Sequence, residues 1–203
     1  KKVCKNALQQ EAGLDEHHDA PLFAVVSRLT PQKGLDLLLP NLERLVELGA
    51  QLVLLGAGDR VLEEGFTAAA RAYPGRIHVR LGYDEDFARR IFAGADALVV
   101  PSRFEPCGLT QLYALAFGTL PVVRRTGGLA DTVKDLELGE DATGIVFQEP
   151  TVEALGEALE RTVRLFVDWP RRWAEMVRRA MKQDFGWRTS AEQYLEVYRG
   201  LLP

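Results

Sequence analysis

Six short apolar runs, most of them separated by segments long enough to hold a helix, constrain the fold of this chain more than any other feature. The runs cover residues 22–28, 51–56, 76–82, 96–101, 120–125 and 144–147. Their apolar character is mostly continuous rather than alternating, which is typical of strands that are covered on both faces. Strands that alternate with helices form right-handed crossovers and a mostly parallel sheet. We therefore predict an α/β fold with a doubly wound, mostly parallel, Rossmann-like sheet.

The segment that follows the first run predicts a helix with one apolar face. Its leucines recur at helical spacing over residues 35–48, and polar residues fill much of the opposite face. Because proline lacks a backbone N–H and clashes with the preceding turn, Pro40 is expected to kink or split this helix.

Beyond the sixth run the pattern changes to three consecutive helices. Thr151 and Ser190 are candidate N-caps, and Pro170 stands at a plausible first-turn position. We assign residues 1–186 to a single sheet domain, and residues 187–203 to a C-terminal helix that leaves this domain.

Composition excludes several classes of protein. The chain has 203 residues, of which 47% are hydrophobic and 27% charged, so it can bury one sizeable core. No apolar stretch is long enough to cross a membrane, and a net charge of -4 lacks the basic surplus that non-specific nucleic-acid binding needs. Two widely spaced cysteines, Cys4 and Cys107, indicate neither a disulfide framework nor a metal site, and favour a reducing, cytoplasmic location. Because the sequence starts KKVCKNALQQ without a methionine, we interpret it as an internal piece of a longer protein.

In a doubly wound sheet, ligands bind at the carboxyl ends of the strands, so the residues after each run are the first candidates for a site. Arg28 and Lys33 flank Pro31 just before the first predicted helix. Two cations beside the positive end of a helix are unfavourable unless an anion binds there, which favours a phosphate site. Two solvated surface cations are the alternative.

The stretch PSRFEPCGL, residues 101–109, follows the fourth run and precedes another helix. Pro106 fixes one backbone angle, and Gly108 permits a tight turn or a close approach of a ligand. The backbone N–H groups at the start of this helix are expected to face the crevice; they belong to Cys107, Gly108, Leu109 and Thr110. Glu105 could accept hydrogen bonds from a polyhydroxylated ligand, or it could be a structural acid at the helix end. For Cys107, we favour a packed side chain over a nucleophile, because no histidine lies near it in sequence.

Gly127 and Gly128 mark a third passage from strand to helix. They could allow a ligand to approach the backbone, or they could simply form a turn. Two other patterns are weaker. The stretch GAGDRV, residues 56–61, lacks the third glycine of a dinucleotide fingerprint, and Asp84 and Asp86 are better explained as first-turn acids than as metal ligands.

Two stretches, which together contain the three candidate segments above, resemble a known family. SRLTPQKGLD and the long stretch GYDEDFARRIFAGADALVVPSRFEPCGLTQLYALAFGTLPVVRRTGGLADTV resemble the C-terminal half of bacterial glycogen synthase and plant starch synthase. The resemblance covers essentially the whole chain. It implies the C-terminal domain of a GT-B fold and a retaining glycosyltransferase. Such enzymes transfer glucose from ADP-glucose to the non-reducing end of an α-1,4-glucan, release ADP, and need neither a cofactor nor a metal.

The resemblance also implies roles for matching positions. Arg28 and Lys33 would hold the diphosphate and offset the charge on departing ADP. Tyr83 would stack on adenine, and Glu105 would bind hydroxyls of the donor glucose. The backbone from Cys107 to Thr110 would meet the sugar and phosphates, with Gly127 and Gly128 nearby.

The chain departs from the wider pattern at one position, because Tyr113 stands where many retaining relatives carry a second glutamate. A ribose contact from that position cannot be carried over. The resemblance further implies that the acceptor groove belongs to an N-terminal domain, toward which the helix of residues 187–203 would pack, so we expect this chain alone to be inactive. Two alternatives remain open: half of a transferase that uses UDP-glucose or makes sucrose or trehalose, and a non-catalytic module that binds sugar nucleotides.

Overall fold

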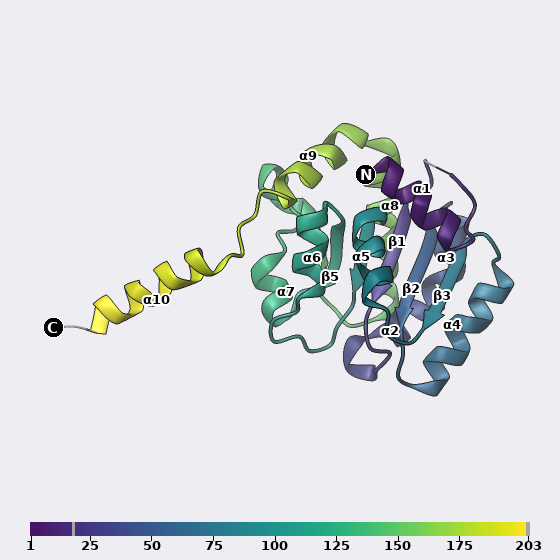
Figure 1. Cartoon of the computed structure of the whole chain (residues 1–203), viewed down its shortest axis with the longest axis horizontal. Helices are drawn as coiled ribbons and strands as arrows, with labels where there is room; N and C mark the ends of the chain where they lie inside the picture. The colour runs from purple at the N-terminus through teal and green to yellow at the C-terminus, as the bar shows by residue number, and fades with distance from the viewer. Residues whose placement is uncertain (18, 202–203) are drawn as a thin grey trace.

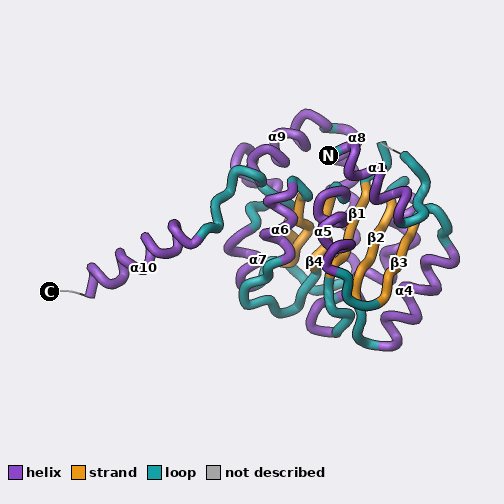
Figure 2. The backbone as a smooth tube through the Cα atoms, in the orientation of Figure 1, coloured by secondary structure: helices purple, strands orange, loops and turns teal. Residues whose placement is uncertain are grey.

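A computed structural model describes residues 1–17 and 19–201, and these residues form one parallel sheet flanked by helices (Figure 2). The strands run in the order β3-β2-β1-β4-β5-β6, and every neighbouring pair is parallel. Their bounds are β1 (Leu22–Val26), β2 (Gln51–Gly56), β3 (Ile77–Leu81), β4 (Ala97–Val100), β5 (Leu120–Arg124) and β6 (Ile145–Phe147). Each strand lies within one of the six apolar runs, so the predicted doubly wound sheet is confirmed.

Helices connect successive strands and cover both faces of the sheet (Figure 1). The α-helices are α1 (Lys2–Glu11), α2 (Leu35–Leu38), α3 (Leu42–Glu47), α4 (Arg60–Ala72), α5 (Glu85–Gly94), α6 (Thr110–Phe117), α7 (Gly127–Thr132), α8 (Val152–Asp168), α9 (Pro170–Ala180) and α10 (Trp187–Leu201). Short 3₁₀ segments are η1 (Pro31–Lys33), η2 (Leu39–Asn41) and η3 (Leu136–Asp141).

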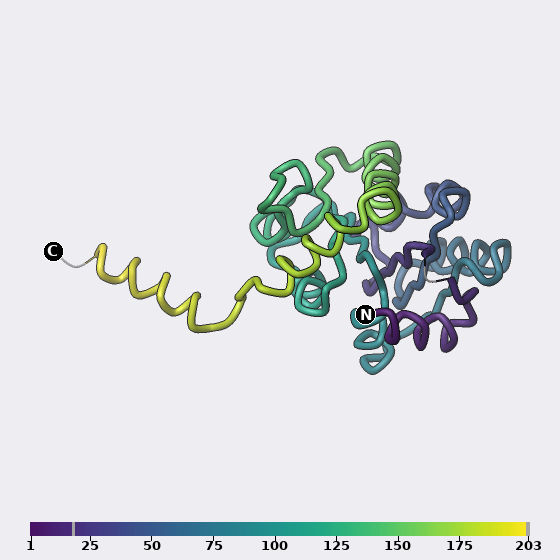
Figure 3. The backbone as a smooth tube through the Cα atoms, turned by 90° about the horizontal axis from the view of Figure 1, so that it is seen from above, coloured from purple at the N-terminus to yellow at the C-terminus, as the bar shows by residue number. Residues whose placement is uncertain are grey.

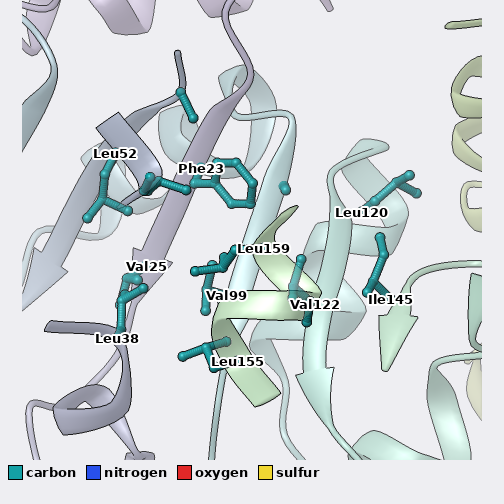
Figure 4. Packing of buried hydrophobic residues seen from close by; sticks show 14 of the residues in the cluster. Phe23, Val25, Leu38, Leu52, Val99, Leu120, Val122, Ile145, Leu155 and Leu159 are labelled. Carbon is teal, nitrogen blue, oxygen red and sulfur yellow. The ribbon is translucent and has the colours of Figure 1, made fainter. Parts of the chain in front are cut away.

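The central strands are buried on both faces, which is why their sequences are continuously apolar. Alternate residues of β1 enter different clusters: Phe23 and Val25 pack with helices α2, α3 and α8, whereas Leu22 and Ala24 pack with α1 and α5. Figure 4 shows the first cluster, in which Leu155 and Leu159 of α8 lie against residues of the central strands. Removing so much apolar surface from water is the main force that holds the sheet together.

Several predicted helix boundaries are confirmed and one is wrong. Pro40 lies in the 3₁₀ segment η2, which separates α2 from α3. Thr151 caps α8 by accepting a hydrogen bond from the N–H of Ala154, and Pro170 starts α9. Ser190 is not an N-cap, because α10 already begins at Trp187 and Asp184 accepts hydrogen bonds from the residues at its start.

The helix α10 projects away from the sheet, and both views show it as a separate arm (Figures 1 and 3). It has no buried residue, although it carries Trp187, Tyr194, Leu195, Val197, Tyr198 and Leu201. The division at residue 186 and the docking of α10 on a further domain stay predictions. None of the helices in residues 1–17 and 19–201 combines the length and apolar character that a membrane crossing needs.

The N-terminal helix α1 was not anticipated from the sequence. It packs on α5 and is held by a buried ion pair, in which the Lys5 Nζ lies 2.6 Å from Asp96 Oδ2. The same oxygen of Asp96 accepts the N–H of Leu22 at the start of β1, and Lys5 also donates to the carbonyl of Ala20. This cluster closes the amino edge of the sheet.

Candidate functional site

The strand order places a candidate site at the carboxyl ends of β1 and β4. Strands β2 and β3 lie in turn on one side of β1, and strands β4, β5 and β6 lie in turn on its other side. At such a switch point the loops after neighbouring strands diverge and leave a crevice. Here these are the β1 loop, residues 27–34, and the β4 loop, residues 101–109. A cavity of about 200 Å³ lies between them, lined by residues that include Arg28, Lys33 and Ser102.

Two further cavities adjoin the first and share Val26 with it. One of about 370 Å³ extends toward β2 and is lined by Arg28, Gly56 and Tyr83. The other, of about 400 Å³, lies between α5 and α6 and is also lined by Tyr83. A larger cavity of about 630 Å³ lies between η3 and α9, and it contains none of the predicted site residues.

Lys33 and Glu105 come from loops far apart in sequence and meet at the switch point. The Lys33 Nζ lies 2.5 Å from Glu105 Oε2, and the side chains are 19% and 10% exposed, respectively. The hydroxyl of Ser102 donates to the same carboxylate oxygen over 3.4 Å. Lys33 lines the small cavity, and the largely buried Glu105 lies directly beside its ammonium.

Arg28 lies on the same edge but is differently placed. It follows β1, is exposed, and lines both the small cavity and the one toward β2. Its guanidinium makes no hydrogen bond or ion pair with the residues that the structure describes. An Arg fork without a protein acceptor is well suited to bind a phosphate group.

The β4 loop leads into α6 without a capping side chain. Leu109 stands at the N-cap position and offers no side-chain acceptor. Within the described residues, the N–H groups of Cys107 to Thr110 donate no backbone hydrogen bond. Such free donors at a helix start favour an anion or a ligand oxygen. Gly108 has a positive φ of 76°, which lets the chain turn into the helix.

Cys107 is exposed, which corrects the prediction of a packed side chain. Its thiol lies 3.6 Å from the carbonyl oxygen of the following residue, Gly108. Its predicted role through the backbone is unaffected by this correction.

Gly127 and Gly128 begin α7 and lie against the β4 loop. A Cβ at Gly127 would collide with the carbonyl oxygen of Glu105, and one at Gly128 with that of Cys107. The N–H of Gly128 also donates to the carbonyls of Glu105 and Pro106 over 3.1 and 3.2 Å. The close approach that these glycines permit is therefore to the β4 loop, and any contact of theirs with a ligand stays a prediction.

Tyr83 follows β3 and is 89% exposed, so its ring is free to stack on a flat ligand. The neighbouring Asp84 caps α5 by accepting a hydrogen bond from the N–H of Phe87 over 2.8 Å. This bond, together with Arg80, holds the pKa of Asp84 below its ordinary value. No group of three or more potential metal ligands occurs within the described part of the chain, and the cap explains Asp84 without a metal.

Sequence reasoning missed the arginines that hold the β4 loop. Arg124 of β5 donates from Nε to the carbonyl of Ser102 over 2.9 Å and also bonds the carbonyl of Arg103. The side chain of Arg103 contacts the opposite loop and forms a two-armed ion pair with Asp36, in which Nη1 and Nη2 each donate to one carboxylate oxygen. The sequence offers a weak signal for Arg124, because a charged residue ends an otherwise apolar strand; nothing local identifies the partner of Arg103.

Known proteins resemble this chain in sequence and in fold. The family described as "Glycosyl transferases group 1" matches residues 8–179. The chain is 54% identical to the glycogen synthase of Yersinia enterocolitica over 207 aligned residues, which cover 99% of this chain and 43% of the relative. It is 56% identical to that of Edwardsiella ictaluri over 199 aligned residues, with coverage of 96% and 42%. The chain thus spans less than half the length of these relatives.

Among solved structures, the catalytic domain of starch synthase IV from Arabidopsis thaliana, bound to ADP and acarbose, is similar with a TM-score of 0.89 and 34% identity. That similarity covers 98% of this chain and 42% of the plant chain. A sucrose-phosphate synthase from Thermosynechococcus elongatus has a TM-score of 0.66 and 26% identity, covering 90% of this chain and 46% of the other.

Proposed function

This chain belongs to the glycosyl transferases group 1 family and has the fold of the C-terminal domain of GT-B enzymes, and we propose that it is the donor-binding domain of a glycogen synthase. Its substrate would be ADP-glucose, and the complete enzyme would add glucose, with retention of configuration, to the non-reducing end of an α-1,4-glucan. The observation that carries the proposal is that Arg28 and Lys33 line one crevice and that Glu105 pairs with Lys33 beside it.

Arg28 and Lys33 would bind the diphosphate of the donor. As the bond between glucose and phosphate breaks, negative charge grows on the departing ADP, and fixed cations stabilise that charge more than they stabilise the bound substrate. Lys33 is held by Glu105, whereas Arg28 has no protein acceptor in the described chain, so its guanidinium is available to bind phosphate.

Glu105 would accept hydrogen bonds from hydroxyls of the donor glucose. Its Oε2 is occupied by Lys33 and Ser102, but the described residues give its second oxygen no hydrogen bond. The N–H groups of Cys107 to Thr110 would meet the sugar and the phosphates. Tyr83 would stack on the adenine beside the cavity that extends toward β2.

We further propose that this chain alone does not transfer glucose. It spans 42–43% of the glycogen synthases that it matches, and the acceptor glucan would bind to residues outside this portion. The starch synthase structure that resembles it is described as bound to ADP and acarbose, which supports a shared pattern of donor nucleotide and carbohydrate acceptor.

Calorimetric titration tests the donor assignment. The chain is expected to bind ADP, and to bind UDP and NAD more weakly or not at all. Stronger binding of UDP would favour a UDP-glucose transferase, and absence of binding by the folded chain would contradict a preformed donor site.

A chimera tests the activity. This chain would replace the matching segment of the Edwardsiella ictaluri glycogen synthase, and incorporation of labelled glucose from ADP-glucose into glycogen would be measured. Transfer by the chimera, but not by the chain alone, is the expected result. A chimera that folds and binds ADP without transfer would favour a non-catalytic module.

A further inference from the structure

We propose that Arg103 is a positioning residue: its guanidinium clamps the β1 loop to the β4 loop and thereby holds Lys33 in place to bind phosphate. This inference rests on the proposed function and names a residue that neither the sequence pattern nor the comparisons single out. It concerns the link between the two loops rather than a contact with the ligand.

The contacts of Arg103 reach both sides of Lys33. One nitrogen, Nη1, donates to Asp36 Oδ1 over 2.6 Å and to the carbonyl of Pro31 over 2.8 Å. The other, Nη2, donates to Asp36 Oδ2 over 2.7 Å. Since Pro31 and Asp36 flank Lys33 in the chain, one side chain fixes both ends of the short segment that presents the ammonium.

The backbone continues the same link. The N–H of Arg103 donates to the carbonyl of Gln32 over 2.9 Å, and the side-chain amide of Gln32 donates to the carbonyl of Phe104 over 3.2 Å. Gly34 lies so close to Pro101 that a Cβ would collide with its carbonyl oxygen. These contacts hold the two loops in a fixed register.

Arginine is suited to this task in a way that lysine is not. Its planar fork matches the two oxygens of a carboxylate and still leaves an N–H for a carbonyl, whereas an ammonium makes a single-point contact. The bonds from Arg103 lower the pKa of Asp36 below its ordinary value and so further favour its charged form. Arg103 is consequently neutralised by its partner, and the pair as a whole carries no net charge.

Because the Arg103–Asp36 pair is neutral overall, the variant Asp36→Asn can distinguish positioning of Lys33 from a simple attraction between Arg103 and the diphosphate. If Arg103 only attracted the diphosphate through its charge, Asp36→Asn would remove an opposing negative charge and strengthen ADP binding. If Arg103 positions Lys33, the same substitution breaks the two-armed pair and weakens ADP binding. The two explanations predict changes of opposite sign.

The test is calorimetric titration of ADP into the folded chain and its variants. Arg103→Ala and Asp36→Asn are each expected to weaken ADP binding by about 3- to 10-fold, and Arg103→Lys by nearly as much as Arg103→Ala. Arg44→Ala serves as the control, because Arg44 forms a similar partly exposed pair with Glu160 outside the crevice. This control is expected to bind ADP as the unsubstituted chain does.

A second measurement excludes a general loss of structure. In a Lys33→Met background, Arg103→Ala is expected to change ADP affinity by less than about 2-fold, because its effect acts through Lys33. Equal weakening in both backgrounds, unchanged affinity in Arg103→Ala, or tighter binding by Asp36→Asn would each overturn the inference. Failure of the unsubstituted chain to bind ADP would instead contradict the proposed function on which the inference rests.

Discussion

Two lysine–carboxylate pairs lie at opposite ends of the parallel strands, one at the amino ends (the amino edge) and one at the carboxyl ends (the carboxyl edge). They illustrate two uses of the same chemistry. At the amino edge, Lys5 and Asp96 are 4% and 7% exposed. At the carboxyl edge, Lys33 and Glu105 are 19% and 10% exposed, with a similar separation of 2.5 Å between the charged atoms. The two pairs differ mainly in what else each charge contacts.

The pair at the amino edge has its hydrogen bonds supplied by the fold. Asp96 Oδ2 accepts from both Lys5 and the N–H of Leu22, and Lys5 also donates to Ala20. At the carboxyl edge, Glu105 Oε2 likewise accepts two hydrogen bonds, but the described residues give the more exposed Lys33 a single acceptor. A lysine with several buried acceptors stabilises the fold, whereas a more exposed lysine with unused donors can bind a ligand.

The largest expected effect comes from breaking the pair at the amino edge. Asp96→Ala leaves the Lys5 ammonium buried without its carboxylate, which is expected to lower the free energy of unfolding by about 3–5 kcal/mol. Urea denaturation measures this change. A loss below about 1 kcal/mol would contradict the view that this pair is structural.

The matched control replaces both charges. The double variant Lys5→Met with Asp96→Leu is expected to recover part of the lost stability, because no charge stays buried without its partner, while the N–H of Leu22 and the carbonyl of Ala20 lose theirs. ADP affinity of the folded molecules is expected to be unchanged in both variants. A change in affinity would show that the two edges are coupled.

Arg28→Ala should have the next largest effect, and on binding rather than stability. Loss of a charge-assisted contact of about 1.5–3 kcal/mol predicts roughly 10- to 100-fold weaker ADP binding. Calorimetric titration measures the affinity, and Arg125→Ala is the control because Arg125 is also exposed and follows β5 at the same edge. Unchanged affinity in Arg28→Ala would reject its assignment to phosphate.

Glu105→Gln distinguishes a contact with the donor sugar from a contact with the phosphates. An amide accepts a hydrogen bond more weakly than a carboxylate, so binding of ADP-glucose relative to ADP is expected to fall by about 5-fold. ADP itself should bind equally well or more tightly, since Lys33 is released from its partner. Equal weakening for both ligands would indicate that Glu105 supports the loop rather than the sugar.

The smallest expected effect concerns Asp36 and Arg103, an ion pair with side chains 44% and 37% exposed. The bonds from Arg103 lower the pKa of Asp36 from its ordinary value of 3.8. A carboxyl group with a lowered folded-state pKa stabilises the fold above its unfolded-state pKa, and this stabilisation is lost as the pH falls through the folded-state pKa.

The stability difference between the unsubstituted chain and Asp36→Asn measures this contribution. It is expected to be at most about 1 kcal/mol near neutral pH, because the pair is exposed to solvent. The difference should shrink as the pH falls below 3.8. A difference that grows toward acidic pH would contradict the role of the charged carboxylate.

The strands and the loops that follow them could be predicted from the sequence, because local periodicity and residue type determine them. The pairing of Lys33 with Glu105 could not, since it depends on which strands lie side by side. Helix α1 was missed because its buried residues include polar ones, Lys5 and Gln9, that sequence reasoning assigns to the surface. The partner of Arg103 is likewise set by tertiary contact alone.

Three glycines let neighbouring segments pack directly on the backbone of the β4 loop, and this close packing has a consequence for redesign of the crevice. Gly34, Gly127 and Gly128 each bring a backbone within touching distance of the β4 loop. Inserting or deleting a residue there would shift several segments at once, so loop length is a poor variable for altering specificity. Exposed side chains that carry none of this packing, such as Tyr83, Phe104 and Leu109, are the positions where libraries can be diversified while the scaffold stays intact.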